Sequence, residues 1–102
     1  MENYSIERAG IANLDFIGEL IGQSGGPSPK IKIYRTKAQK FVGESRADLK
    51  MAQAQHFDKP DDLIVWFKSL NGYTVSPDVQ DAIEDAAKND DAFKAAWNEH
   101  VE

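Results

Sequence analysis

The 102-residue chain contains no cysteine, and this absence excludes disulfide bonds, thiolate nucleophiles and cysteine-ligated metal sites. The chain also has no apolar run that approaches the roughly 18–20 residues needed to cross a bilayer. The segment Met1–Tyr4 lacks the basic and apolar regions with which a signal peptide begins. We therefore expect a cytoplasmic protein without a membrane partner.

Motifs of catalysis and cofactor binding are also missing. Gly25 and Gly26 do not belong to a Gly-x-x-x-x-Gly-Lys phosphate loop, and a strand pattern follows them where a helix would be needed. No serine lies in a nucleophile-elbow pattern. His56 and Asp58 supply only two potential ligands, whereas a metal site needs three or four. The sequence thus predicts a non-enzymatic protein with no catalytic residue, no cofactor and no bound metal.

The residues that are present suffice for one domain and divide it by charge. Hydrophobic residues make up 41% of the chain, enough for a single core, so we expect one domain over residues 1–102. Residues 1–57 carry eight Lys and Arg against six Asp and Glu, a net charge of +2, whereas residues 58–102 carry four Lys against eleven Asp and Glu, a net charge of −7. This bipolar distribution argues against a protein that coats itself with nucleic acid on all sides.

The N-terminal half reads as a sheet. Residues 30–36 alternate between apolar and polar side chains, which is typical of a half-buried strand. The segment 22–29 is rich in Gly and Pro and is expected to form a long hairpin loop. Residues 1–13 fit neither helical nor strand periodicity and are expected to form a lead-in segment or a short helix. We predict a four-stranded antiparallel meander with strands at 14–21, 30–36, 40–46 and 49–57, and turns at 37–39 and near 47–48.

The C-terminal half reads as helices. Asp58 can act as an N-cap before Pro60, and Ser76 can do the same before Pro77, because Ser and Asp side chains accept hydrogen bonds from the first helical turn and Pro suits its first position. Asn89, Asp90 and Asp91 then break the second helix and can cap a third. The expected helices span 59–70, 77–88 and 91–101. Strands followed by helices predict the α+β class.

Two surfaces are candidates for binding. On the strand at 30–36, Lys32, Tyr34 and Thr36 share one face, which with Phe41 could form a basic aromatic platform. The carboxylates of the second helix lie on its outer side and could dock on a basic patch. The residues that we expect to contact a partner are Lys32, Tyr34, Arg35, Asp78, Asp81 and Asp85.

Two resemblances follow from these residues. The strand Ile31-x-Ile33-Tyr34-Arg35-Thr36 and the step Asp58-x-Pro60 resemble small uncharacterised bacterial proteins, which implies a fold and no function. The same strand, together with Phe57-Asp58, Leu63, Trp66-Phe67, Leu70 and Ile83, is similar to phage-encoded anti-CRISPR inhibitors of type I-F systems. That similarity implies a meander followed by two helices, and a sheet face that binds the effector complex with Tyr34 taking part. The chain differs from those inhibitors by its N-terminal extension and by a third helix around Trp97.

These observations favour a small protein-interaction module with a protein or ribonucleoprotein partner. Its most concrete form is a mobile-element-encoded inhibitor of a bacterial defence complex. The alternative is a nucleic-acid-binding regulator that uses the same basic sheet face. If the sheet face binds the partner, replacing Lys32 and Tyr34 by alanine should leave the fold intact and weaken binding.

Overall fold

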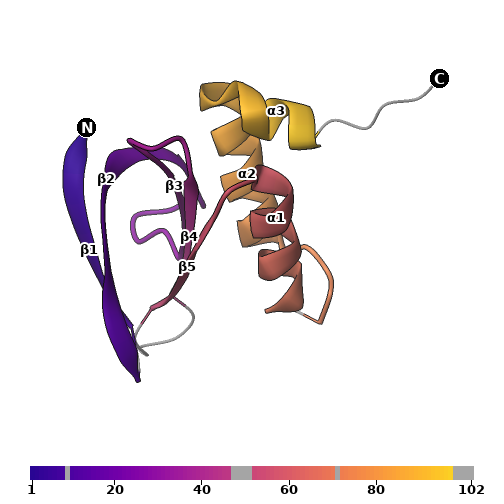
Figure 1. Ribbon diagram of the computed structural model, residues 1–102. Coiled ribbons are helices and arrows are strands. Elements are labelled where there is room, and N and C mark those ends of the chain that lie inside the picture. The colour runs from indigo at the N-terminus through magenta and orange to yellow at the C-terminus, as the bar shows by residue number, and fades with distance from the viewer. Residues whose placement is uncertain (9, 47–51, 71, 98–102) are drawn as a thin grey trace.

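A computed structural model describes residues 1–8, 10–46, 52–70 and 72–97 of the chain. Strands precede helices along the sequence (Figure 1), so the predicted α+β class is confirmed. The elements are β1 Glu2–Arg8, β2 Ile11–Gln23, β3 Ile31–Thr36, β4 Phe41–Ser45, β5 Gln53–Phe57, α1 Pro60–Ser69, α2 Pro77–Asn89 and α3 Asp91–Trp97. None of the helices in the described ranges combines the length and the apolar character that a membrane span requires.

The five strands form one antiparallel sheet in sequence order, and this sheet is curled. The long strand β2 serves two partners: β1 pairs with it from Ile11 to Gly18, and β3 pairs with it from Gly18 to Gln23. At the change-over, a Cβ on Gly18 would lie 2.4 Å from the carbonyl oxygen of Arg35, so only glycine fits there. Figure 1 shows the β1–β2 hairpin on the side of the β3–β5 sheet that faces away from the helices, which gives three layers.

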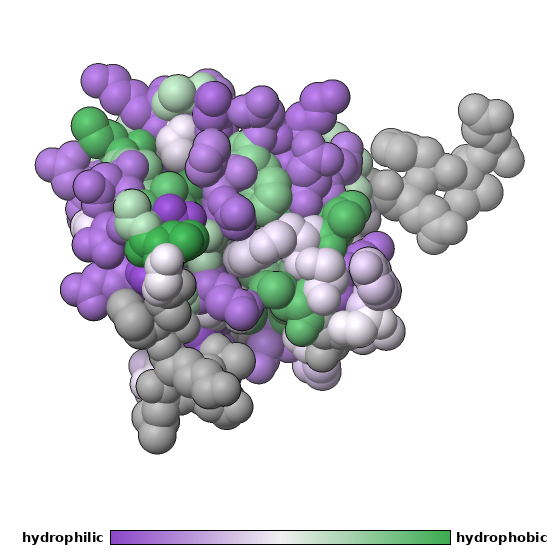
Figure 2. All heavy atoms as spheres, turned by 60° about the horizontal axis from the view of Figure 1, so that its bottom comes forward, coloured by the Kyte–Doolittle hydropathy of each residue, from purple (hydrophilic) through white to green (hydrophobic). Residues whose placement is uncertain are grey.

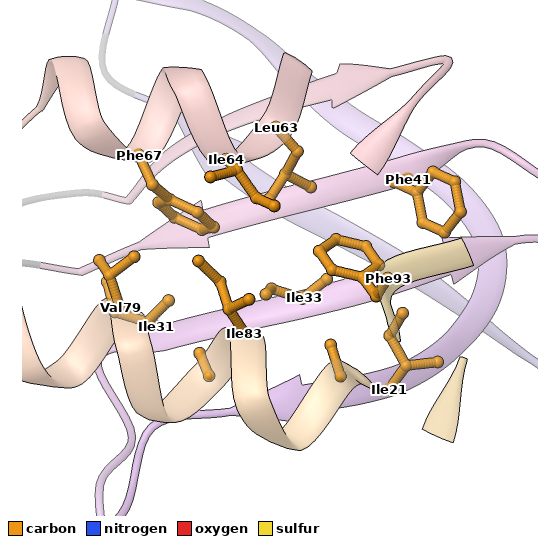
Figure 3. Close-up of a cluster of buried hydrophobic side chains, with 12 residues drawn as sticks. Ile21, Ile31, Ile33, Phe41, Leu63, Ile64, Phe67, Val79, Ile83 and Phe93 are labelled. Carbon is orange, nitrogen blue, oxygen red and sulfur yellow. The ribbon is translucent and has the colours of Figure 1, made fainter. Parts of the chain in front are cut away.

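The larger core lies between the central sheet and the helices. Ile33 from β3 and Phe67 and Ile83 from the helices are almost completely buried there (Figure 3). Helix α2 packs very closely on β2, since a Cβ on Gly22 would lie 2.4 Å from the carbonyl oxygen of Ala82. The buried members of this core are Ile21, Ile31, Ile33, Phe41, Leu63, Ile64, Phe67, Val79, Ala82, Ile83, Ala86 and Phe93.

A second, smaller core lies between the hairpin and the central sheet. Its centre is a group of three rings, in which Tyr34 lies 4.7 Å from Tyr4 and 5.2 Å from Phe16 between ring centroids. Tyr4 and Tyr34 belong to strands that are not neighbours in the sheet, so the curl is what brings them together. The buried members are Ile6, Tyr34, Val42, Ala52 and Ala54. The hairpin is therefore an integral layer of the domain.

This hairpin corrects the expectation for residues 1–13. The segment is neither a loose lead-in nor a helix, because Glu2–Arg8 forms β1 and Ile11 begins β2. Tyr4 and Ile6 alternate with Asn3 and Ser5, and Ile6 is buried. Gly10 adopts a φ of +76° in the turn, a conformation that glycine accepts at little cost. The predicted four-stranded meander is thus a five-stranded one.

The other predicted elements agree with the structure, with two exceptions: β2 continues to Gln23, into the predicted loop 22–29, and one helix start differs. Ser76 Oγ accepts from the Val79 N–H at 3.3 Å and caps α2 as expected. The predicted N-cap Asp58 is wrong, because Lys59 occupies that position and no side chain caps α1. Asp58 instead lies 3.4 Å from Lys40 as an exposed ion pair. The turn near 47–48 and the ends of two predicted elements, 49–51 and 98–101, lie outside the described residues.

Candidate functional site

Tyr34, which the sequence assigned to a binding face, lies inside the smaller core. Only 4% of its surface is exposed, and its hydroxyl donates to Glu44 Oε1 at 2.9 Å. Arg46 Nε donates to the other oxygen of that carboxylate at 2.8 Å. Burial, and then the negative charge of Glu44, raise the pKa of Tyr34 well above its ordinary value. The ring therefore supports the hairpin layer and has no surface to offer a partner.

Arg35 lies on the opposite face of β3, where it joins the sheet to α3. Its Nη1 donates to Asp90 Oδ2 at 3.0 Å, and its Nη2 pairs with Glu19. The hydrogen bond to Glu19 raises the pKa of Arg35 above its ordinary, already high value, so the guanidinium stays charged. Asp90 is buried, and its Oδ1 also accepts from the Phe93 N–H at 3.1 Å, which caps α3. Arg35 is therefore committed to contacts within the domain.

Lys32 points to the same side of the sheet as Tyr34 and is half-buried. Phe41, the other aromatic residue expected on a platform, is buried in the larger core. The structure thus separates the three predicted sheet residues: Lys32 and Tyr34 face the hairpin, and Arg35 faces the helices. An exposed basic and aromatic platform is not formed by these residues.

The acidic residues of α2, in contrast, come together on one flank of the helix. Asp78, Asp81 and Asp85 have the spacing i, i+3, i+7, which places them in a row along the helix, and we call them the acidic row. Asp78 and Asp81 are exposed and take part in no ion pair among the described residues. Asp85 is half-buried and accepts from the backbone N–H of Gln23 at 3.2 Å. The row therefore combines two free carboxylates with one that ties α2 to β2.

A pocket of about 380 Å³ opens between the hairpin and the central sheet. Apolar side chains of Leu14, Phe16 and Val42 form much of its wall, and Lys37 and Lys40 lie at its mouth on the β3–β4 turn. Sequence reasoning missed this pocket, because its two walls belong to strands that meet only through the curl. A prediction that residues 1–8 pair with β2 would have indicated the pocket.

The described part of the chain contains no group of three or more His, Asp or Glu side chains that could hold a metal ion. His56 is exposed at the end of β5, as its position in the sequence predicted. The face in Figure 2 carries small hydrophobic groups separated by hydrophilic residues, so a partner on this face would meet mainly polar groups. Comparison of the chain with models of protein families, with curated proteins and with solved structures gives no match.

Proposed function

We propose that this domain is a small non-enzymatic protein-interaction module that docks its acidic row on a basic surface of a protein or ribonucleoprotein partner. The observation that supports this proposal is the exposure of Asp78 and Asp81 without an ion pair among the described residues. Exposed charges without internal partners keep their full attraction for an oppositely charged surface. They also steer the approach of such a surface over about a Debye length, roughly 8 Å at physiological salt.

The helix that carries the row is rigidly held, which favours binding. Ile83 on its inner side is fully buried, and the backbone of α2 touches β2 at Gly22. Aspartate has a short side chain, so few rotamers are lost when its carboxylate is fixed by a partner. A row of this kind is pre-organised for a matching row of Lys or Arg.

The resemblance to type I-F anti-CRISPR inhibitors suggests which partner this is. We propose a bacterial defence complex as the most concrete form, since such complexes hold nucleic acid in positively charged channels that an acidic row complements. The contact that we propose uses Asp78 and Asp81 in place of the buried Tyr34. A purified type I-F effector complex tests this form directly: its binding to target DNA should fall when the domain is added. Unchanged DNA binding would reject the inhibitor and leave the wider proposal to be tested on its own.

The wider proposal is tested by affinity capture from a nuclease-treated lysate of the native host, read by quantitative mass spectrometry. Three baits are compared: the parent, the double variant Asp78→Asn with Asp81→Asn, and a control with Asp61→Asn and Asp62→Asn. The control removes the same charge from exposed positions in the first turn of α1. A partner should be retained by the parent and the control and be depleted roughly two- to fivefold per aspartate by the row variant. If all three baits retain the same proteins equally, the row is not the contact.

The nuclease treatment also tests the alternative function. A nucleic-acid-binding regulator needs exposed rings on which bases can stack, and Tyr34 and Phe41 are both buried. We therefore expect capture of the partner to survive nuclease, and we expect no retention of single-stranded DNA or RNA by the domain at low salt.

A further inference from the structure

One edge of β2 lies open beside the pocket. The strand β1 pairs with the first half of β2 on one side, but β3 pairs with the other side only from Gly18 to Gln23. On that side the Lys37 N–H also donates to the Ile17 carbonyl, at 2.8 Å, and within the described ranges no strand pairs with the residues that precede Ile17 there. In an antiparallel sheet alternate residues direct their backbone groups to the same edge. The N–H and C=O of Asp15 therefore point to the edge that β3 leaves uncovered.

The pocket borders this edge and not a face of the strand. Its wall includes four consecutive residues of β2, from Leu14 to Ile17. Successive side chains of a strand point to opposite faces of the sheet. Four successive residues can therefore all border one pocket only if the pocket lies along the backbone edge of the strand. Val42 and His56 lie across the pocket from them. The arrangement thus places backbone groups that no described strand pairs with beside a largely apolar pocket.

Two lysines border the pocket. Lys37 and Lys40 are exposed on the β3–β4 turn, and Lys40 forms an exposed, and therefore weak, ion pair with Asp58 at 3.4 Å. Asp15 also borders the pocket, and its carboxylate accepts a hydrogen bond from Ser5 Oγ at 2.6 Å. An acidic group beside an apolar one would complement this mouth.

We infer that the open edge of β2 between Ile11 and Ile17 binds an extended peptide of a partner protein as an additional strand. The peptide pairs with the backbone of Asp15, places one apolar side chain in the pocket, and sets an acidic side chain against Lys37 and Lys40. The volume of about 380 Å³ is near the lower end of ligand pockets, roughly 300 Å³, and suits one or two side chains. This site is separate from the acidic row, so it goes beyond the function proposed above and can fail independently of it.

The probe for this site is the blocked peptide acetyl-Glu-Thr-Val-Thr-Glu-amide, titrated into the ¹⁵N-labelled domain. We expect the amide signals of Asp15, Ile17 and His56 to shift in a saturable way and hydrogen exchange of the Asp15 N–H to slow. Asp15→Pro removes that N–H and should abolish the shifts. The fold should tolerate this proline, because the Asp15 N–H points away from β1 and proline is accepted where the N–H faces an unpaired edge. Asp15→Ala keeps the N–H and should bind like the parent.

Charge is tested separately. The double variant Lys37→Gln with Lys40→Gln should weaken peptide binding by roughly two- to fivefold per lysine. Removing two exposed lysines from the helices, with Lys88→Gln and Lys94→Gln, should leave binding unchanged. Equal binding by both variants would contradict the cationic mouth.

A second set of probes keeps the test decisive if Asp15→Pro does not fold: versions of the peptide in which each backbone nitrogen in turn is methylated and can no longer donate a hydrogen bond. At least one of them should lose binding, and retention by all of them would overturn strand addition. Two further results would also overturn the proposal. If octanoate shifts the same amide signals and the peptide does not, the pocket is a site for small amphiphiles. If the domain dimerises in a concentration-dependent way and Asp15→Pro abolishes the dimer, the edge pairs with a second copy of the chain.

Discussion

The role of Arg35 can be decided by stability measurements, because the structure assigns it a contact inside the domain. Replacing it by methionine keeps the length of the side chain and removes the charge. Among the described residues, the Asp90 side chain, which is 3% exposed, would then keep only its hydrogen bond from the Phe93 N–H. Breaking a buried ion pair by removing one member typically costs about 3–5 kcal/mol. Since the side chain of Arg35 is itself 30% exposed, we expect a smaller loss, about 2–3 kcal/mol.

The pair can be isolated by a double-mutant cycle. Asp90→Asn retains an oxygen that can cap α3 and should cost about 1–2 kcal/mol. The double variant should cost less than the two single losses together, by about 1–2 kcal/mol of coupling. Lys32→Met is the matched control, because Lys32 lies on the same strand, faces the other way and takes part in no ion pair among the described residues.

Urea unfolding followed by the fluorescence of Trp66 and Trp97 measures these differences. With a slope of roughly 1–2 kcal/mol per molar urea, the midpoint of Arg35→Met should fall by about 1–3 M, whereas that of Lys32→Met should move by less than about 0.5 M. A loss below about 0.5 kcal/mol for Arg35→Met, or a coupling near zero, would refute the structural role. Arg35 would then again be a candidate for direct contact with a partner.

Three further outcomes follow from the packing. Gly22→Ala should destabilise the domain by about 2–3 kcal/mol and lower its thermal midpoint by about 10 °C or more, because the new Cβ would lie 2.4 Å from the backbone of α2. Gly25→Ala is the control, since a Cβ there has nothing within 4 Å, and it should change the thermal midpoint little. Equal thermal midpoints of the two variants would contradict the close approach of α2 to β2. Tyr34→Ala should lower the free energy of unfolding in urea by about 3–5 kcal/mol, since the ring is buried in the smaller core. This differs from the sequence-based expectation that the substitution leaves the fold intact. A loss below about 1 kcal/mol would mean that the ring is not packed. Because the pKa of Tyr34 is raised in the folded state, the unfolded chain loses the Tyr34 hydroxyl proton at lower pH than the folded chain does. The neutral hydroxyl therefore contributes its full stability below about pH 10, and this contribution falls by about 1.4 kcal/mol per pH unit above it. The urea midpoint of the parent should drop more between pH 9 and pH 11 than that of Tyr34→Phe, and parallel drops would contradict the pKa shift.

Much of the fold could be predicted from short patterns. The alternation of Ile31 to Thr36 and the starts of the helices at Pro60 and Pro77 depend on residues within one or two turns of the chain. The strand β1 was missed although Tyr4 and Ile6 carry a period of two, because Gly10 and the small residues around it interrupt the pattern where the hairpin turns. Residue type alone predicts Asp58 as the N-cap, but the N-cap position falls one residue later, at Lys59.

The candidate site was predicted only where helical spacing decides it. Asp78, Asp81 and Asp85 share a flank of α2 in any helix of this sequence. The sheet residues were less predictable, since alternation says which side chains share a face and does not say what covers that face. Lys32 and Tyr34 do share one face of β3, but a second core covers it.

Local patterns in the sequence predict the α+β class, the succession of strands and then helices, and the contrast in charge between the two halves of the chain. These properties depend on composition and on neighbours in the chain. Only the folded chain shows that β1 and β2 fold over the sheet, that Tyr34 is buried against Tyr4 and Phe16, and that no described strand covers one edge of β2. The physical reason is that each of these depends on contacts between strands distant in the sequence, and no local pattern encodes which faces and edges such contacts will cover.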